Sequence, residues 1–181
     1  MTTPSPSTRS FQQVQDNPVH LGREITVPIC EGLNLAWASL QGLYLQYLKH
    51  HLVVEGAEFY SIHQFFNESL QEVQNHAHEV GERLNGLGGI PASSFAKLAE
   101  LCCFSPEGDD ALAVRPMLEA DLRAEQSLID LLRRQAALAE SVGDRATRHL
   151  YEQILLRTEE RAFHLAHFLA ADSLVLGLSP P

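Results

Sequence analysis

Four side chains in the first half of the chain have the types and spacings of metal ligands: His51, His63, His78 and Glu82. Imidazole nitrogens and carboxylate oxygens together bind zinc and iron. His78 and Glu82 are four residues apart, so on a helix they lie one turn apart and could hold one ion. His51 and His63 flank a short turn and could meet across it. These residues predict a histidine-rich metal site.

The spacing of these residues also predicts how the site is divided. Fifteen residues of helix separate His63 from His78, which at about 1.5 Å per residue is roughly 22 Å. One chain therefore carries two half-sites, and a two-fold axis pairing these helices antiparallel would join each half to the partner's other half. The alternative is that the histidines are unrelated solvated or hydrogen-bonded side chains. We interpret His50, His76 and His167 as surface residues or as residues that support the ligands.

Long helices would position these ligands. Apolar residues recur at intervals of three and four along most of the chain, and no segment shows the alternation of a strand. Pro116 indicates either a kink or a later start in the third long helix. The expected helices are residues 29–54, 58–87, 94–101, 110–142 and 145–171. Four of these helices are long, and the short helix at 94–101 lies in a long middle connection. This arrangement predicts an all-α, ferritin-like four-helix bundle.

Composition sets further limits. With 181 residues and 45% apolar content, the chain suits one domain, which we place at residues 19–175, with a flexible arm at 1–18 and an irregular tail at 176–181. The net charge of −10 and an arm whose only cation is Arg9 make DNA binding unfavourable.

Three features indicate a cytoplasmic protein. No apolar run reaches the roughly 18 residues that span a bilayer, so we expect no membrane association. The first thirty residues lack a secretion leader. Cys30, Cys102 and Cys103 have no disulfide or metal spacing, which favours a reducing compartment and structural thiols.

The pattern of residues resembles the Dps family, the mini-ferritins named for DNA protection in starved cells. The resemblance covers roughly residues 30–170. The segments that carry it are His51-Leu-Val-Val-Glu-Gly-Ala-Glu-Phe59, His63, Glu82-Arg83, Leu87-Gly-Gly89, Gly143-Asp-Arg-Ala-Thr147 and the acidic run before Phe163.

The resemblance implies both an assembly and an activity. The expected assembly is a hollow dodecamer whose ferroxidase sites are shared across two-fold interfaces. The expected activity is oxidation of Fe(II) by H2O2 or O2, with storage of Fe(III) and protection from oxidative stress. The expected catalytic ligands are His51, His63, His78 and Glu82.

Several positions depart from the family pattern. His78 stands where the family has aspartate, and Leu52 and Phe163 stand where it has tryptophan. Imidazole suits zinc as well as iron, whereas carboxylate oxygens favour iron. We therefore expect zinc to compete for the site. A zinc-binding or metal-buffering cage is the alternative function, and a DNA-binding nucleoid protein is a weaker one.

Three further residues are candidates for metal handling. His164 follows Phe163 and could approach His78 from the same chain as an added ligand. Glu68 could nucleate the ferric mineral. By resemblance, Asp144 would line a pore through which iron enters, although an N-cap of the last helix is an equal alternative.

Overall fold

A computed structural model describes residues 9–11 and 13–170; the predicted tail at 176–181 lies outside this part of the chain. The described residues form five helices and no strand. They are α1 (Arg23–Val53), α2 (Phe59–Gly86), α3 (Phe95–Leu101), α4 (Val114–Ser141) and α5 (Arg145–Phe168). The predicted all-α class, with a short helix in the middle connection, is confirmed.

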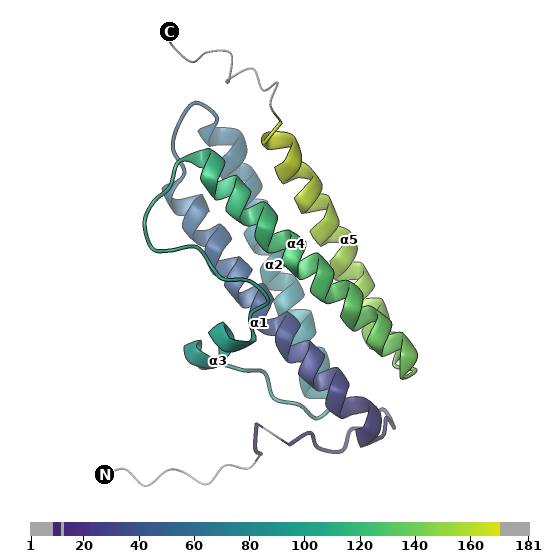
Figure 1. Cartoon of the computed structure of the whole chain (residues 1–181). Helices are drawn as coiled ribbons and strands as arrows, with labels where there is room; N and C mark the ends of the chain where they lie inside the picture. The colour runs from purple at the N-terminus through teal and green to yellow at the C-terminus, as the bar shows by residue number, and fades with distance from the viewer. Residues whose placement is uncertain (1–8, 12, 171–181) are drawn as a thin grey trace, which may run out of the picture.

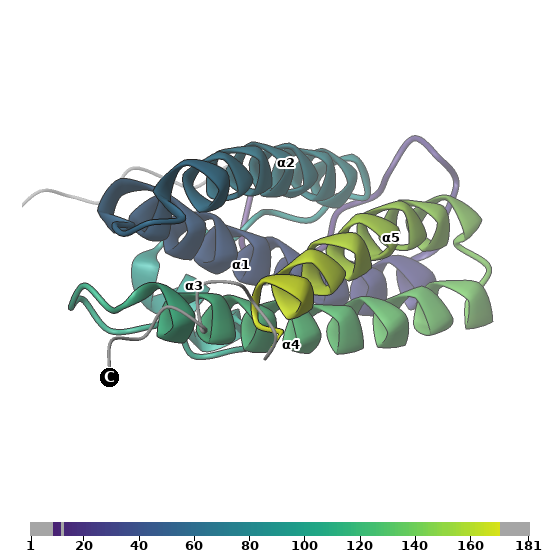
Figure 2. The same cartoon turned by 90° about the horizontal axis from the view of Figure 1, so that it is seen from above.

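The four long helices form two antiparallel hairpins packed side by side, α1 with α2 and α4 with α5 (Figures 1 and 2). The connection from α2 to α4 runs back along the bundle and carries α3, which lies against α1 (Figure 1). Each long helix turns an apolar stripe inward. The fully buried centre includes Leu33, Leu40 and Tyr47 of α1, Phe66, Val73 and Val80 of α2, Leu128 and Leu132 of α4, and Tyr151 and Ile154 of α5.

The starts of two long helices differ from the prediction, and each helix contains a proline near its start. Helix α1 begins at Arg23, ahead of the predicted start at residue 29, and includes Pro28. Helix α4 begins at Val114, after the predicted start at residue 110, with Pro116 as its third residue. The first four N–H groups of a helix have no partner within it, so Pro116 removes no hydrogen bond. The structure therefore shows the later start, not a kink.

The chain before α1 is attached to the far end of α2. Arg9 donates hydrogen bonds of 3.0 and 2.9 Å to the carbonyls of Gly88 and Gly89. The N–H of Gln15 donates to the Gly88 carbonyl at 3.0 Å. Gly88 has a φ of +90°, and a Cβ there would lie 2.2 Å from the Gln15 oxygen, so the contact requires glycine. Of the predicted flexible arm, residues 1–8 and 12 lie outside the described residues, whereas Arg9 and Gln15 are held against the bundle.

None of the described helices combines the length and apolar character that crossing a bilayer requires.

Candidate metal centre

His51 and His63 form the first half of the predicted centre. His51 lies in the last turn of α1 and His63 in the first turns of α2, and their rings stack with centroids 3.9 Å apart. The Nδ1 of His63 lies 3.0 Å from the carbonyl of His51, and the Nδ1 of His51 lies 3.3 Å from the carbonyl of His63. A carbonyl only accepts, so each Nδ1 carries a proton and donates it. In the neutral form of each ring, Nε2 then keeps a lone pair that can bind a metal.

His78 and Glu82 form the second half, one turn apart on α2. Their Nε2 and Oε1 atoms are 4.0 Å apart, and the two side chains are 76% and 71% exposed. Among the described residues, no hydrogen bond or ion pair holds either side chain apart from this mutual contact. The pair is therefore free to turn toward a shared ion.

The two halves stay apart within one chain. Among the described residues, no three His, Cys, Asp or Glu side chains are gathered so as to hold a metal ion. Helix α2 is continuous between His63 and His78, which fixes their separation at roughly 22 Å. A site that uses all four ligands therefore needs a second chain.

The prediction that His164 approaches His78 of its own chain is wrong. The His164 ring lies 6.3 Å from that of Phe65, in a groove of about 200 Å³ between α2 and α5. Thirteen residues of α2, roughly 20 Å, separate Phe65 from His78. The groove also contains Glu68, whose carboxylate accepts a 2.6 Å hydrogen bond from Gln64.

Asp144 does not have the setting predicted for a pore residue. It is the N-cap of α5 and is 2% exposed, so its carboxylate is already buried within one chain. It accepts hydrogen bonds from Thr147 and a 2.7 Å ion pair from Arg83 of α2. The structure therefore supports the N-cap alternative.

His50 is the main polar residue whose setting the sequence interpretation missed. It is fully buried, with Nδ1 2.8 Å from Asp121 of α4 and Nε2 2.8 Å from Glu107 of the connection. With both nitrogens donating, the ring is an imidazolium. Burial alone would lower the pKa of His50, but the two carboxylates raise it above its ordinary value. The signal was present, because His50 follows the buried Tyr47 by three residues on the core face of α1.

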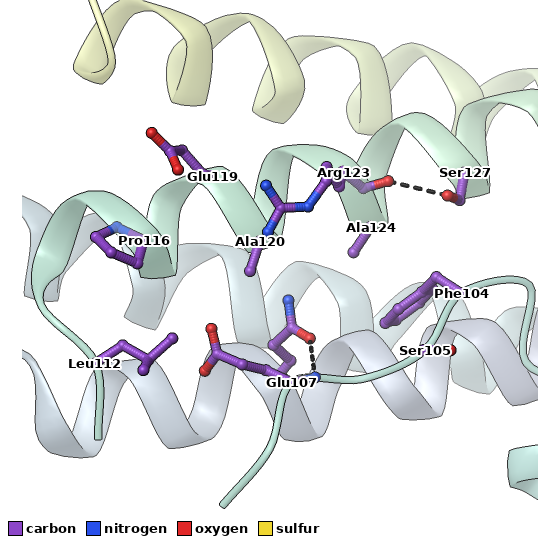
Figure 3. Close-up of a pocket in the computed structure, with 11 residues that line it drawn as sticks. Phe104, Ser105, Glu107, Leu112, Pro116, Glu119, Ala120, Arg123, Ala124 and Ser127 are labelled. Atoms are coloured by element: carbon purple, nitrogen blue, oxygen red, sulfur yellow. Dashed lines mark hydrogen bonds between the residues drawn. The ribbon is translucent and has the colours of Figure 1, made fainter. Parts of the chain in front are cut away.

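Glu107 also borders the cavity shown in Figure 3, which has a volume of about 400 Å³. Phe104 and Glu107 of the connection face Pro116, Ala120 and Arg123 of α4 across it (Figure 3). None of the predicted metal ligands lines this cavity. It is therefore separate from the candidate centre.

The cysteines fit structural roles. All three thiols are free; Cys30 is buried, and Cys102 and Cys103 are half-buried. Burial raises the pKa of Cys30 to about 11 and also raises the pKa values of Cys102 and Cys103. These thiols are therefore protonated and weakly nucleophilic at neutral pH.

Comparison with known proteins agrees with this architecture. The Ferritin-like domain family matches residues 30–175. The nutrient stress-induced DNA-binding protein of Nostoc sp. is 66% identical over 173 residues, which cover 96% of this chain and 94% of that protein. The protein of the same name from Synechococcus sp. is 59% identical over 168 residues, covering 93% of this chain and 96% of that protein.

A solved structure gives the same result for the fold. The crystal structure of an archaeal Dps homologue from Halobacterium salinarum superposes with a TM-score of 0.91 at 30% identity, covering 96% of this chain and 97% of that one. Both the sequence relatives and the shared fold extend over nearly the whole chain, and the chain therefore belongs to the Dps family of ferritin-like proteins.

Proposed function

We propose that this chain is a subunit of a dodecameric cage that oxidises Fe(II) at sites shared by two subunits and stores the Fe(III) product. Membership of the ferritin-like family supports iron chemistry in general. The observation that carries the site is the division of its ligands along α2. His51 and His63 present free Nε2 atoms at one end, and the exposed His78 and Glu82 lie toward the other.

The chemistry follows from this division. The Nε2 atoms of His51 and His63 bind the substrate Fe(II) from one side, and the partner subunit's His78 and the partner subunit's Glu82 bind it from the other. Each Fe(II) loses one electron. Two such electrons and two protons convert one H2O2 into two waters as its O–O bond breaks; O2 is the alternative oxidant. The Nδ1 hydrogen bonds hold both imidazoles in the tautomer that ligation needs.

Zinc is proposed as a competitor for the same ligands. Three imidazoles and one carboxylate supply fewer hard oxygen donors and less negative charge than a site with two carboxylates. Fe(III) gains most from such oxygens, so the loss weakens the preference for iron. This donor set is also the observation behind a second candidate function, a zinc-buffering cage. Titration calorimetry can test both zinc competition and zinc buffering. Zn(II) binding that is weaker than Fe(II) binding would argue against each of them.

The groove between α2 and α5 is proposed as the place where Fe(III) first deposits. Glu68, Glu72 and Glu160 line it, together with His164. Carboxylates favour Fe(III), and Glu68 is exposed at the surface. Replacing Glu68 by Gln should slow growth of the mineral after oxidation and leave the oxidation rate unchanged.

Complementation between two inactive variants tests the shared site. His63→Ala removes a ligand from the first half, and His78→Ala removes one from the second. When the two chains are co-expressed, a dimer of unlike chains contains one intact site and one that lacks both ligands. We expect each variant alone to oxidise Fe(II) slowly, and mixed cages to recover up to about half of the wild-type rate.

The matched control pairs two variants of the same half, His51→Ala with His63→Ala. No dimer formed from those chains contains an intact site, so mixing should restore nothing. Two results would show that the site is not shared in this way. One is recovery of activity in the control mixture. The other is no recovery in the His63→Ala with His78→Ala mixture when mixed cages are confirmed.

DNA binding is a third candidate function, because the Nostoc and Synechococcus relatives carry it in their names. We propose that Arg9 does not contribute to DNA binding in this chain, because its guanidinium is already hydrogen-bonded to the end of α2. A gel shift at low salt, with wild-type cages beside Arg9→Ala cages, tests this. Wild-type binding that Arg9→Ala abolishes would overturn the proposal.

A further inference from the structure

One carboxylate oxygen beside the cavity between the connection and α4 has no hydrogen-bond donor. The side chain of Glu107 is 10% exposed, and its Oε1 is buried without a partner among the described residues. The other oxygen, Oε2, accepts from Nζ of Lys49 at 3.0 Å and from Nε2 of His50 at 2.8 Å. The basic side chains of α1 therefore satisfy one half of this carboxylate and leave the other half unsatisfied.

The position and the charge of this carboxylate are fixed. The N–H of Glu107 donates to Oε1 of Gln46 at 3.2 Å, and Nε2 of Gln46 donates to Asp121 at 2.8 Å. Burial acts to raise the pKa of Glu107, but hydrogen bonds from His50 and Lys49 hold it below its ordinary value of 4.5. Glu107 is therefore ionised at neutral pH. A buried, ionised oxygen without a donor is costly, so Oε1 is suited to a donor from outside the chain.

The opposite wall of the cavity carries a cation. Arg123 of α4 borders the cavity across from Glu107 (Figure 3). Glu119, one turn before Arg123 on the same helix, borders it as well. Arg123 is exposed, and within the part of the chain that the structure describes no ion pair joins it to either carboxylate. Opposite charges therefore face one space from two sides.

The rest of the lining is mainly apolar. Phe104, Leu112, Pro116, Ala120 and Ala124 supply its carbon surface. The volume of about 400 Å³ lies in the range in which proteins hold small organic molecules. An apolar space with a few convergent polar groups is typical of a ligand pocket.

We propose that this cavity binds a small zwitterion, an α-amino acid with an apolar side chain. Its ammonium donates to Oε1 of Glu107, and its carboxylate accepts from the guanidinium of Arg123. Its apolar side chain packs against Leu112 and Pro116. A ligand with only one of these charges leaves the other group of the cavity without a partner. The cavity contains none of the proposed iron ligands, so the proposal goes beyond iron oxidation and does not depend on it.

Titration calorimetry on full-length, metal-free cages tests the class of ligand. Three compounds of similar shape separate the two charges. L-Leucine carries both, 3-methylbutylamine lacks the carboxylate, and 4-methylpentanoate lacks the ammonium. We expect about one L-leucine per chain at saturation. Each of the other two compounds should bind at least about tenfold more weakly, because it loses a charge-assisted hydrogen bond.

Two variants on α4 test the place of binding. Arg123→Met removes the cation from an exposed position, and Ala120→Leu fills the cavity without a change of charge. We expect each variant to weaken L-leucine binding at least about tenfold. Arg134→Met is the matched control, because Arg134 is an exposed arginine of α4 that does not border the cavity. It should bind L-leucine as the wild type does.

Glu107→Gln tests the ammonium end of the site. The amide oxygen can still accept from α1, but the amide nitrogen then turned to the cavity is a donor and cannot accept from an ammonium. We expect L-leucine to bind about tenfold more weakly, while 4-methylpentanoate, which has no ammonium, binds as weakly as before. Thermal unfolding checks that the variant folds. If it does not, Arg123→Met and Ala120→Leu decide the question.

Three results would overturn the proposal. The first is no saturable binding of L-leucine to folded wild-type cages, in which case water alone satisfies Glu107. The second is equal affinity for L-leucine and 3-methylbutylamine, which would indicate a site for amines only. The third is L-leucine binding that either Arg123→Met or Ala120→Leu leaves unchanged, because the ligand is then bound differently. No iron is present in these titrations, so they stand apart from the complementation test.

Discussion

The indole of Trp37 on α1 lies directly against Gly81 on α2. A Cβ placed on Gly81 would be 2.8 Å from Cζ3 of Trp37, closer than side chains pack. The indole Nε1 donates a 2.7 Å hydrogen bond to the Ala92 carbonyl, which fixes the ring in place. Gly81 thus permits the close approach of α1 and α2 one residue before Glu82 of the proposed centre.

Gly81→Ala should therefore weaken the packing of α1 on α2. We expect a loss of about 1–3 kcal/mol from forced repacking, and slower Fe(II) oxidation because the turn carrying Glu82 shifts. Trp37 is the only tryptophan, so its fluorescence reports the change directly. Urea unfolding followed at the Trp37 emission measures the free energy.

Gly86→Ala is the matched control. It is also a glycine of α2, but nothing lies within 4 Å of an added Cβ. We expect unchanged or slightly higher stability. Equal stability and equal emission for wild type and Gly81→Ala would contradict the packing argument.

His50→Gln should destabilise the chain because it leaves Asp121 buried without its charged partner. The expected loss is about 3–5 kcal/mol at pH 6. The folded-state pKa of His50 lies above its ordinary value of 6.5. Its contribution is therefore complete below pH 6.5 and is lost as the pH rises through the raised folded-state pKa. Unfolding of wild type and His50→Gln, measured at a series of pH values from about 6 upward, should show the difference shrinking toward high pH.

Lys49→Gln is the control for His50, because Lys49 bonds the same Glu107 but is partly exposed. Its loss should cost less than about 1 kcal/mol. A difference between wild type and His50→Gln that grows with pH would show that His50 is neutral in the folded chain.

Asp144→Ala should cost about 2–3 kcal/mol, since it removes the cap of α5 and the ion pair with Arg83. Burial acts to raise the pKa of Asp144. Hydrogen bonds from Thr147 and Arg83 outweigh burial and hold this pKa below its ordinary value of 3.8. Its contribution is therefore present above pH 3.8 and lost as the pH falls through the lowered value. Thermal unfolding at pH 7 and at acidic pH measures this.

Asp144→Asn separates the cap from a pore role, because the amide still caps the helix but carries no charge. We expect iron uptake at the wild-type rate. A clear loss of uptake in cages of normal stability would restore the pore assignment. Glu152→Ala, an exposed partner of Arg148, is the control for a simple change of surface charge.

His78→Asp should shift metal preference toward iron. A carboxylate restores one negative charge and one hard oxygen. We expect the ratio of Fe(II) to Zn(II) affinity to rise roughly tenfold, about 1.4 kcal/mol, in competition titrations. Gln74→Asp places the same charge one turn away on the same exposed stripe and should change the ratio little. Equal shifts in both variants would indicate a general field effect instead of ligation.

Local spacing predicted what depends on a single helix. The apolar repeat located all five helices, and the four-residue interval placed His78 beside Glu82. The short turn brought His51 against His63 for the same reason, since only a few residues join them. Helix starts were less accurate: α1 begins six residues ahead of the predicted start and continues through Pro28, and α4 begins four residues after it.

Contacts between distant helices were not predictable in this way. His164 lies beside Phe65 because of the position of α5 along the axis of α2. No local sequence pattern encodes that relative position. Asp144 is buried because Arg83 reaches it from 61 residues away. Glu107 was not singled out at all, because the basic side chains that it bonds lie on α1, and one sequence shows no sign of their meeting.

The distance along α2 between the two ligand pairs also determines when iron oxidation can begin. A newly made chain holds only half of each proposed site, and α2 is too stiff to fold the halves together. Iron oxidation would thus begin only after subunits associate, and would fall on dilution below the concentration at which they separate. Reactive chemistry would be delayed until the chain is folded and enclosed.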